Sequence, residues 1–268
     1  MEADLISVVI PTYNRCWCLN RSVGSVLAQT GVDFELIVVD DGSSDQTHEF
    51  LKPLASEGRL KLISNKERLG VSSARNLGIK AAEGAFIALL DSDDEWLKDK
   101  LFLQKQYMDQ NPAIMISQCR ERWIRNGRRV NPGIKHVKKQ GDIFEASLKL
   151  CLISPSAVII RKTLLDEVGL FDETLPSAED YDLWLRIAKS HKVGLLDEEL
   201  AIRYAGHDDQ LSNEPGLDRY RIRALKKLLN SRLTASQRSL AAEELRRRRK
   251  VYEAGRIKRV QKERLRGD

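Results

Sequence analysis

The amino-acid sequence predicts an α/β fold, an αβα sandwich with a mostly parallel central sheet, followed by a helical C-terminal extension. Between residues 5 and 110, short apolar runs alternate with amphipathic segments of helical length. Such alternation is typical of βαβ units, which place their strands parallel in one sheet. Beyond residue 215 the apolar spacing becomes helical and the composition strongly basic.

The predicted strands of the first half are continuously apolar, as at residues 7–10, 36–39 and 86–90. A parallel sheet is covered by helices on both faces, so its strands need not alternate between apolar and polar residues. We therefore predict strands at 5–10, 34–39, 60–64 and 85–90, and helices at 16–29, 46–56, 71–83 and 95–110.

The second half is less regular. Residues 113–140 are rich in Arg and Gly, and we predict strands and loops there rather than another βαβ unit. Beyond them the pattern predicts helices at 142–150, 162–168 and 179–190, and strands at 154–161 and near 193–204.

Charge is distributed unevenly along the chain. Residues 217–268 hold 18 Lys and Arg against 6 Asp and Glu, which leaves residues 1–216 with 27 against 33. Because the body is acidic, we do not expect nucleic acid as its partner. The arginines at 246–249 are explained either as the solvated face of a helix or as a contact with an anionic membrane surface.

Cysteine usage and hydropathy indicate the compartment. The four cysteines form no CxxC pair and have no histidines at zinc-ligand spacing, which favours reduced thiols. The N-terminus lacks the features of a signal peptide, and the longest apolar runs, such as 85–90, fall far short of the roughly 20 residues that span a bilayer. We expect a cytoplasmic protein that is at most peripheral to the inner face of a membrane.

Acidic residues follow two of the predicted strands, at 40–45 and 91–95. Ligands of open α/β sheets bind beyond the carboxyl ends of the strands, and clustered carboxylates repel each other unless a cation or another ligand joins them. Asp91 and Asp93 could share a divalent cation, although helix capping and loop solvation explain such a pair more often when it stands alone. An EF-hand is excluded because Trp96 and Phe102 occupy the positions that need Gly and Glu.

Taken in order, several segments resemble glycosyltransferase family 2, whose members are inverting transferases with the GT-A fold of nucleotide-diphospho-sugar transferases. The joint match is far more specific than any single segment. The matching segments are residues 9–15, 38–45, 70–78, 91–94, 154–157, 169–173, 179–186 and 204–212.

The resemblance implies a site for a nucleotide-diphosphate sugar, with UDP as the expected nucleotide. In this family Asp41 would hydrogen-bond the nucleobase, and Arg75 would contact the donor or a carboxylate. Asp93 would ligate Mg²⁺ or Mn²⁺, and Asp91 would support the ribose or metal-bound waters. The other donor-binding residues that the resemblance implies are Pro11, Thr12, Tyr13, Asn14 and Ser92.

Asp180 would be the base that takes the proton from the acceptor hydroxyl. An inverting single displacement needs one carboxylate that faces the attacking hydroxyl and no covalent nucleophile. When the pair Glu179-Asp180 stands alone, it is more often an acidic first helical turn that complements the helix dipole. The resemblance also makes His207 a metal ligand or a contact of the diphosphate, whereas a lone loop histidine is usually just solvated.

The resemblance covers roughly residues 5–213, expected to be a GT-A domain with a nucleotide-binding half at 1–110 and an acceptor-side half at 111–213. Residues 214–268 form the basic extension. The Gln-x-x-Arg-Trp signature of processive members is absent. We therefore expect addition of a single sugar to a sugar or lipid-linked acceptor, in the synthesis of cell-surface polysaccharide or glycolipid.

Two alternatives remain at this point. A nucleotidyltransferase of related topology usually carries a Gly-rich loop after its first strand, and residues 11–15 contain no glycine. A non-catalytic nucleotide-sugar-binding scaffold with a basic tail would have no need for four carboxylates at these spacings.

Overall fold

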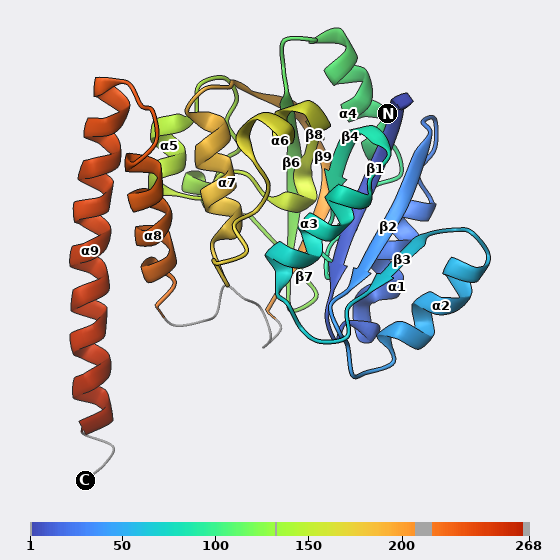
Figure 1. The fold of residues 1–268 in the computed structure, drawn as a ribbon, viewed down its shortest axis with the longest axis horizontal. Coiled ribbons are helices and arrows are strands. Elements are labelled where there is room, and N and C mark those ends of the chain that lie inside the picture. The colour runs from blue at the N-terminus through green and yellow to red at the C-terminus, as the bar shows by residue number, and fades with distance from the viewer. Residues whose placement is uncertain (1, 132, 207–215, 265–268) are drawn as a thin grey trace.

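The computed structural model describes residues 2–131, 133–206 and 216–264, in which a single sheet is covered by helices on both faces (Figure 1). The predicted αβα sandwich is confirmed. The strands are β1 (Glu2–Thr12), β2 (Phe34–Asp40), β3 (Lys61–Ser64), β4 (Gly84–Leu89), β5 (Glu95–Trp96), β6 (Ile116–Arg125), β7 (Arg128–Val130), β8 (Val158–Arg161) and β9 (Val193–Ala205). The α-helices are α1 (Cys16–Leu27), α2 (Thr47–Ser56), α3 (Val71–Ala81), α4 (Lys100–Gln110), α5 (Phe144–Lys149), α6 (Lys162–Val168), α7 (Glu179–Ala188), α8 (Asp218–Leu229) and α9 (Ala235–Arg264).

The sheet has the strand order β3-β2-β1-β4-β8-β6-β9-β5, and β7 pairs with β6. Strands β3, β2, β1 and β4 are parallel, whereas β8 is antiparallel to both β4 and β6. Strands β6 and β9 run in the same direction as β4, so the sheet is mostly parallel, as predicted. The chain reaches β3 on one side of β1 and then crosses to β4 on the other side. The ends of β1 and β4 therefore flank the kind of crevice in which open α/β sheets bind ligands.

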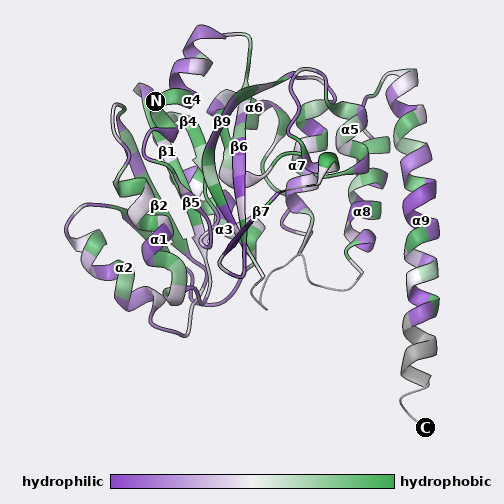
Figure 2. Ribbon diagram, turned by 180° about the vertical axis from the view of Figure 1, so that it is seen from behind, coloured by the Kyte–Doolittle hydropathy of each residue, from purple (hydrophilic) through white to green (hydrophobic). Residues whose placement is uncertain are grey.

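Side chains of the parallel strands pack alternately into two apolar layers. Val9, Ile37 and Leu89 contribute to the layer that contains residues of α3, α6 and α7. Val8 and Val38 contribute to the opposite layer, with residues of α1, α2 and α4. Figure 2 shows the hydrophobic strands between these helices. Burial on both faces explains the apolar runs that predicted these strands.

One predicted helix begins later than its sequence pattern suggested. The region 95–110 was expected to be helical throughout, but Glu95–Trp96 form β5, and α4 begins at Lys100. Trp96 is buried, its indole donates to the carbonyl of Ser156 at 2.7 Å, and its backbone N–H donates to Ser25 Oγ at 3.1 Å. These tertiary hydrogen bonds outweigh the local helical pattern.

The predicted C-terminal helical region is present as α8 and α9. Ala224, Leu225 and Leu228 of α8, with Ala241 and Leu245 of α9, belong to the same apolar layer as residues of α5 and α7. The second half of α9 extends beyond α8, on the side where β1 and β2 end (Figure 1). The domain boundary predicted at residue 213 falls outside the described residues. No helix in the described ranges combines the length and apolar content needed to cross a bilayer.

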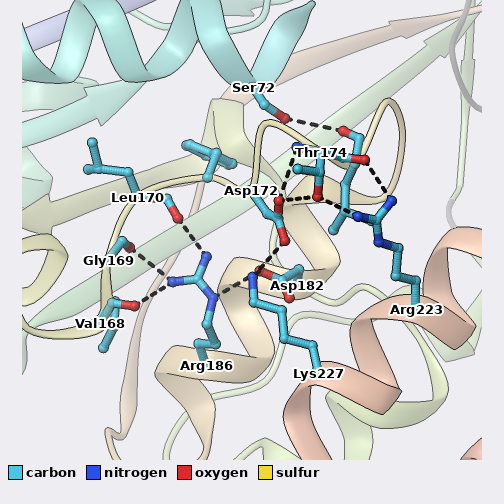
Figure 3. Close-up of polar contacts among 12 residues, drawn as sticks. Ser72, Val168, Gly169, Leu170, Asp172, Thr174, Asp182, Arg186, Arg223 and Lys227 are labelled. Carbon is cyan, nitrogen blue, oxygen red and sulfur yellow. Dashed lines mark hydrogen bonds and ion pairs between the residues drawn. The ribbon is translucent and has the colours of Figure 1, made fainter. Parts of the chain in front are cut away.

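Polar contacts attach α8 to the body of the protein (Figure 3). Lys227 of α8 donates to Asp172 at 2.8 Å and to Asp182 of α7 at 3.0 Å. Arg223, one turn earlier, donates to the carbonyl and the hydroxyl of Thr174. Arg186 donates to Asp182 and to three carbonyls of the loop after α6. The position of α8 thus depends on ion pairs as well as on apolar packing.

Candidate active site

A cavity of about 430 Å³ opens at the carboxyl ends of β1 and β4. It is lined by every residue that the sequence assigned to donor binding, and by Asp93. These residues are Pro11, Thr12, Tyr13, Asn14, Asp41, Arg75, Asp91, Ser92 and Asp93. Of the two other predicted site residues, Asp180 is not part of the lining and His207 lies outside the described residues. Below, this space is called the donor cavity.

The loops after β1 and β2 are joined by hydrogen bonds that shape one wall of the donor cavity. Asn14 has a positive φ of 52°, which asparagine tolerates better than most residues. Its backbone N–H donates to Ser43 Oγ at 2.9 Å, and its side-chain oxygen accepts from the N–H of Ser44 at 2.8 Å. The N–H of Arg15 donates to Thr47 Oγ1 at 3.1 Å. These hydrogen bonds hold the two loops together as one wall of the donor cavity.

Asp41 holds the opposite wall in place. Its buried carboxylate accepts hydrogen bonds from Asn65 Nδ2 at 2.8 Å, from the N–H of Leu69 at 2.9 Å and from the N–H of Gly70 at 2.7 Å. The same segment brings Arg68 into the lining of the cavity. Asp41 was predicted only as a nucleobase contact, and the structure adds this second role as an anchor of residues 65–70.

Arg75 connects the donor cavity to α7. Its guanidinium, which is 4% exposed, donates from Nη2 to Asp91 Oδ1 at 2.7 Å and from Nη1 to Glu179 Oε1 at 2.6 Å. Burial raises the pKa of Glu179 to about 6 against the opposing charge of Arg75, and the neighbouring Asp180 adds to the rise. The two ion pairs join the first residue of α7 to Asp91, which follows β4, and Asp180 is the next residue of α7.

Asp180 is the second residue of α7 and directly follows Glu179, which pairs with Arg75 of the cavity lining. Its carboxylate accepts from the Cys151 thiol at 3.4 Å and from the N–H of Tyr181 at 2.6 Å. Burial and the charge of Asp180 raise the pKa of Cys151 well above its ordinary value, so the thiol stays neutral. Arg203, which lines the cavity, lies close enough for Asp180 to contribute to its raised pKa, with Glu121, Asp94 and Asp91 contributing more.

Three carboxylates crowd the loop after β4. Asp94 is buried, accepts from Ser156 Oγ at 2.6 Å and accepts from the N–H of Tyr204 at 3.0 Å. Its pKa is raised well above the ordinary value by burial and then by the proximity of Asp93 and Asp91. Asp91 is paired with Arg75, as described above. Asp93 lines the cavity together with Asp91 and Asp94.

These residues fit a divalent cation that takes most of its ligands from substrate. Within the described ranges, no three Asp, Glu, His or Cys side chains converge on a complete metal site. Mg²⁺ sites on phosphate substrates commonly use one or two carboxylates, with phosphate oxygens and water as the other ligands. A carboxylate at the cavity wall, beside two others that repel it, is the donor set that such an ion requires.

Sequence reasoning missed several residues of this site. Arg203 and Tyr204 come from the end of β9, and the Tyr204 ring lies 3.7 Å from the guanidinium carbon of Arg21. Ser156 stood in a matching segment, but its place between Asp91 and Asp94 was not foreseen. For Arg203 the one available signal was its position at the end of a predicted strand, directly before the last matching segment.

Comparisons with known proteins agree with this geometry. The family model described as glycosyl transferase family 2 matches residues 7–169. An uncharacterized glycosyltransferase of Rickettsia conorii is 36% identical over 202 residues, which are 75% of this chain and 33% of that protein. The chain thus spans about a third of that relative's length. The Escherichia coli protein WfgD, named as a UDP-Glc:α-D-GlcNAc-diphosphoundecaprenol β-1,3-glucosyltransferase, is 36% identical over 197 residues, covering 74% of this chain and 75% of that one.

Solved structures of glycosyltransferases share the fold. Residues 1–349 of S. aureus TarS in complex with UDP-GlcNAc match with a TM-score of 0.73 and 25% identity, over 90% of this chain and 71% of that one. The mannosyltransferase PcManGT of Pyrobaculum calidifontis, in complex with GDP-Man and Mn²⁺, matches with a TM-score of 0.62 and 17% identity, over 91% of this chain and 70% of that one. The architecture is that of the GT-A transferases.

Proposed function

We propose that this chain, which belongs to glycosyl transferase family 2, transfers a single sugar from a UDP-sugar to a hydroxyl of a lipid-linked saccharide, with inversion of the anomeric centre. One observation carries the proposal: nine residues assigned from four separate segments line one cavity, and Arg75 of this lining pairs with Glu179, the residue before Asp180. The substrates named for the E. coli relative, and the UDP-GlcNAc bound to TarS, support the choice of a UDP-sugar and a lipid-linked acceptor.

In this proposal the nucleotide lies along residues 11–14 and reaches Asp41. Thr12 Oγ1 is buried in the cavity wall and has no hydrogen-bond partner among the residues that the structure describes. An unpaired buried hydroxyl costs free energy that a ligand can recover. The guanidinium of Arg68 lies 4.4 Å from the centre of the Tyr13 ring, which gives the nucleobase a planar surface beside the cavity.

Asp93 would hold Mg²⁺ or Mn²⁺, and Asp91 would orient the water bound to it. When bound, the cation offsets the negative charge on the departing nucleoside diphosphate. The described residues contribute the carboxylates, and the ion pair with Arg75 holds the Asp91 carboxylate in position.

Asp180 would act as the general base. As the acceptor oxygen attacks the anomeric carbon and the bond to the diphosphate breaks, the hydroxyl proton passes to the Asp180 carboxylate. The pair of Arg75 with Glu179 holds the first turn of α7, which limits the movement of Asp180. The neutral Cys151 thiol donates to Asp180 and would keep one of its oxygens oriented.

Replacement of the base tests this assignment. We expect Asp180→Asn to lower kcat by about 10²–10⁴-fold, the usual contribution of general base catalysis, and to leave Mn²⁺-dependent UDP binding unchanged in calorimetry. Asp166→Asn, on the exposed face of α6, is the matched control. Undiminished turnover in Asp180→Asn would refute the assignment. Release of pyrophosphate from a nucleoside triphosphate, with no UDP released from a UDP-sugar, would indicate a nucleotidyltransferase.

We also propose that the chain works at the inner face of a membrane, held there by α9. The middle of this helix carries exposed basic residues, including Arg246, Arg249 and Lys250. Val251 and Ile257 of the same helix are 47% and 53% exposed. Basic residues near an anionic bilayer each contribute about 1 kcal/mol of attraction. The helix extends on the side of the donor cavity, so this contact would bring the cavity near the lipid surface.

A further inference from the structure

A second cavity, of about 340 Å³, lies between the beginning of α8 and the middle of α9. Its walls include Asp218 and Arg221 of α8, and Arg248, Val251 and Tyr252 of α9. We call it the α8–α9 cavity. It has no part in the donor site described above.

One cation of this cavity has no counterion among the residues that the structure describes. Arg248 donates to Asp218 at 2.8 Å and to Glu244 at 2.6 Å, so both of these carboxylates are already engaged. Arg221, in contrast, forms no ion pair with any carboxylate in the described part of the chain, and its Nε atom is buried without a hydrogen-bond partner. A buried, unpaired guanidinium nitrogen is costly, and an anion that accepts from it would remove that cost.

The unpaired cation lies close to the proposed base. The guanidinium carbon of Arg221 is 5.8 Å from the centre of the Tyr181 ring, and Tyr181 directly follows Asp180. Arg221 also lowers the pKa of Cys151, the residue whose thiol donates to Asp180, although burial and Asp180 itself raise that pKa more. Arg221 therefore lies against the residue that follows Asp180 and within electrostatic range of the thiol that donates to it.

We propose that Arg221 binds a phosphate group of the acceptor, so that the α8–α9 cavity is the subsite for the phosphates that join the acceptor sugar to its lipid. This inference rests on the proposed function and specifies the acceptor. A guanidinium can donate two parallel hydrogen bonds to phosphate oxygens, and the buried Nε is one of the donors suited to this geometry. Val251, which lines the cavity and is 47% exposed, provides apolar surface on the side toward the lipid chain.

The test compares Arg221→Gln with Lys226→Gln, which removes the same charge from an exposed position of the same helix. Two acceptors are used, decyl N-acetylglucosaminyl diphosphate and decyl N-acetylglucosaminide. We expect Arg221→Gln to raise KM for the diphosphate acceptor by about tenfold to hundredfold, the range for a lost charge-assisted hydrogen bond, and to leave KM for the glucosaminide unchanged. Arg221→Lys keeps the charge without the planar fork and should give an intermediate KM.

A binding measurement makes the test independent of turnover. Decyl diphosphate is titrated into each variant in EDTA, which removes the cation that the donor cavity would need. We expect measurable binding to the wild type and to Lys226→Gln, and a loss of about tenfold or more in Arg221→Gln. A wild-type protein that binds decyl diphosphate but does not hydrolyse any UDP-sugar would contradict the proposed function and leave the phosphate subsite standing.

Other results would overturn the subsite. Equal losses with both acceptors would show that Arg221 supports the fold or the base, and unchanged binding and KM would show that it meets no phosphate. Arg221→Gln is also tested for sedimentation with phosphatidylglycerol vesicles. Weaker sedimentation with unchanged discrimination between the two acceptors would assign Arg221 to membrane headgroups and not to the acceptor.

Discussion

The donor cavity and the α8–α9 cavity differ in the charges of their linings. The donor cavity is lined by the carboxylates of Asp41, Asp91, Asp93 and Asp94 and by the guanidinium groups of Arg15, Arg68, Arg75 and Arg203, of which Arg75 is paired with Asp91 and with Glu179 outside the lining. At the α8–α9 cavity, Asp218 and Glu244 are paired with Arg248, and the guanidinium of Arg221 has no carboxylate partner among the described residues. Both cavities are proposed to receive phosphates.

The difference shows how one protein can keep two phosphorylated substrates apart. The carboxylates clustered after β4 repel a diphosphate unless a divalent cation lies between them, whereas a guanidinium without a carboxylate partner attracts it directly. Donor binding should therefore depend on metal, and acceptor binding should not. Each prediction below tests one part of this contrast.

The largest effect is expected from the donor side. Asp93→Asn keeps the shape of the side chain and removes its charge, and we expect it to weaken Mn²⁺-dependent UDP binding by about a hundredfold or more, since a cation at a phosphate contributes several kcal/mol. EDTA should have the same effect on the wild type. Calorimetric titration of UDP with and without Mn²⁺ measures both.

The control for this prediction is decyl diphosphate binding in EDTA, which we expect Asp93→Asn to leave intact. If neither the substitution nor EDTA weakened UDP binding, the donor cavity would bind a diphosphate without a cation. The expected difference between the two cavities in metal dependence would then be wrong.

A smaller effect is expected when the basic surface of α9 is neutralised. At about 1 kcal/mol per residue, replacement of Arg246, Arg249 and Lys250 by Gln should weaken binding to phosphatidylglycerol vesicles by roughly a hundredfold at low salt. Vesicle sedimentation measures this partition, which should also fall as salt rises. UDP binding should not change.

The matched control removes three charges from the donor half, at Lys52, Lys66 and Lys80, all of which are exposed. If this triple variant lost as much vesicle binding as the α9 variant, net charge would explain the attraction. The proposal that α9 is the membrane-binding surface would then be wrong.

Much of the donor half could be predicted because its signals are local. The apolar runs at 34–39 and 85–90 became β2 and β4 with small changes at their ends, since strands buried on both faces carry few polar residues. The residues that follow these strands meet because parallel strands end at one edge: Thr12 lies opposite Asp40, and Asp40 opposite Ser64. This placed Asp41 and Asp91 in one cavity.

The features of the fold and the site that could not be predicted depend on contacts between residues far apart in the sequence. Arg75 and Glu179 are separated by 104 positions, and no local pattern showed that they would pair. The short strand β5 exists because Trp96 donates to Ser156, 60 positions away, against a local pattern that favoured a helix. No sequence pattern pointed to Arg221, because only the packing of α8 beside α9 shows that it has no carboxylate partner among the described residues.

The strands beside the donor cavity and helix α8 also differ in the interactions that hold them in place. The smallest predicted effect follows from this difference. The parallel strands beside the donor cavity are held by apolar layers, whereas α8 is also held by Lys227 on Asp172 and Asp182 (Figure 3). Although burial opposes it, hydrogen bonds from Lys227 and Thr174 lower the pKa of Asp172 to about 2 from the ordinary 3.8.

A carboxyl whose pKa is lower in the folded state stabilises that state above its unfolded pKa and ceases to do so as the pH falls through the folded value. Asp172→Asn should therefore lower the free energy of unfolding by about 0.5–1 kcal/mol at pH 7, and the difference from the wild type should shrink between about pH 4 and pH 2. Urea unfolding at several pH values measures it, with Asp166→Asn as an exposed control that should match the wild type throughout. A difference that persisted below pH 2 would mean that Asp172 holds α8 by packing and not by its charge.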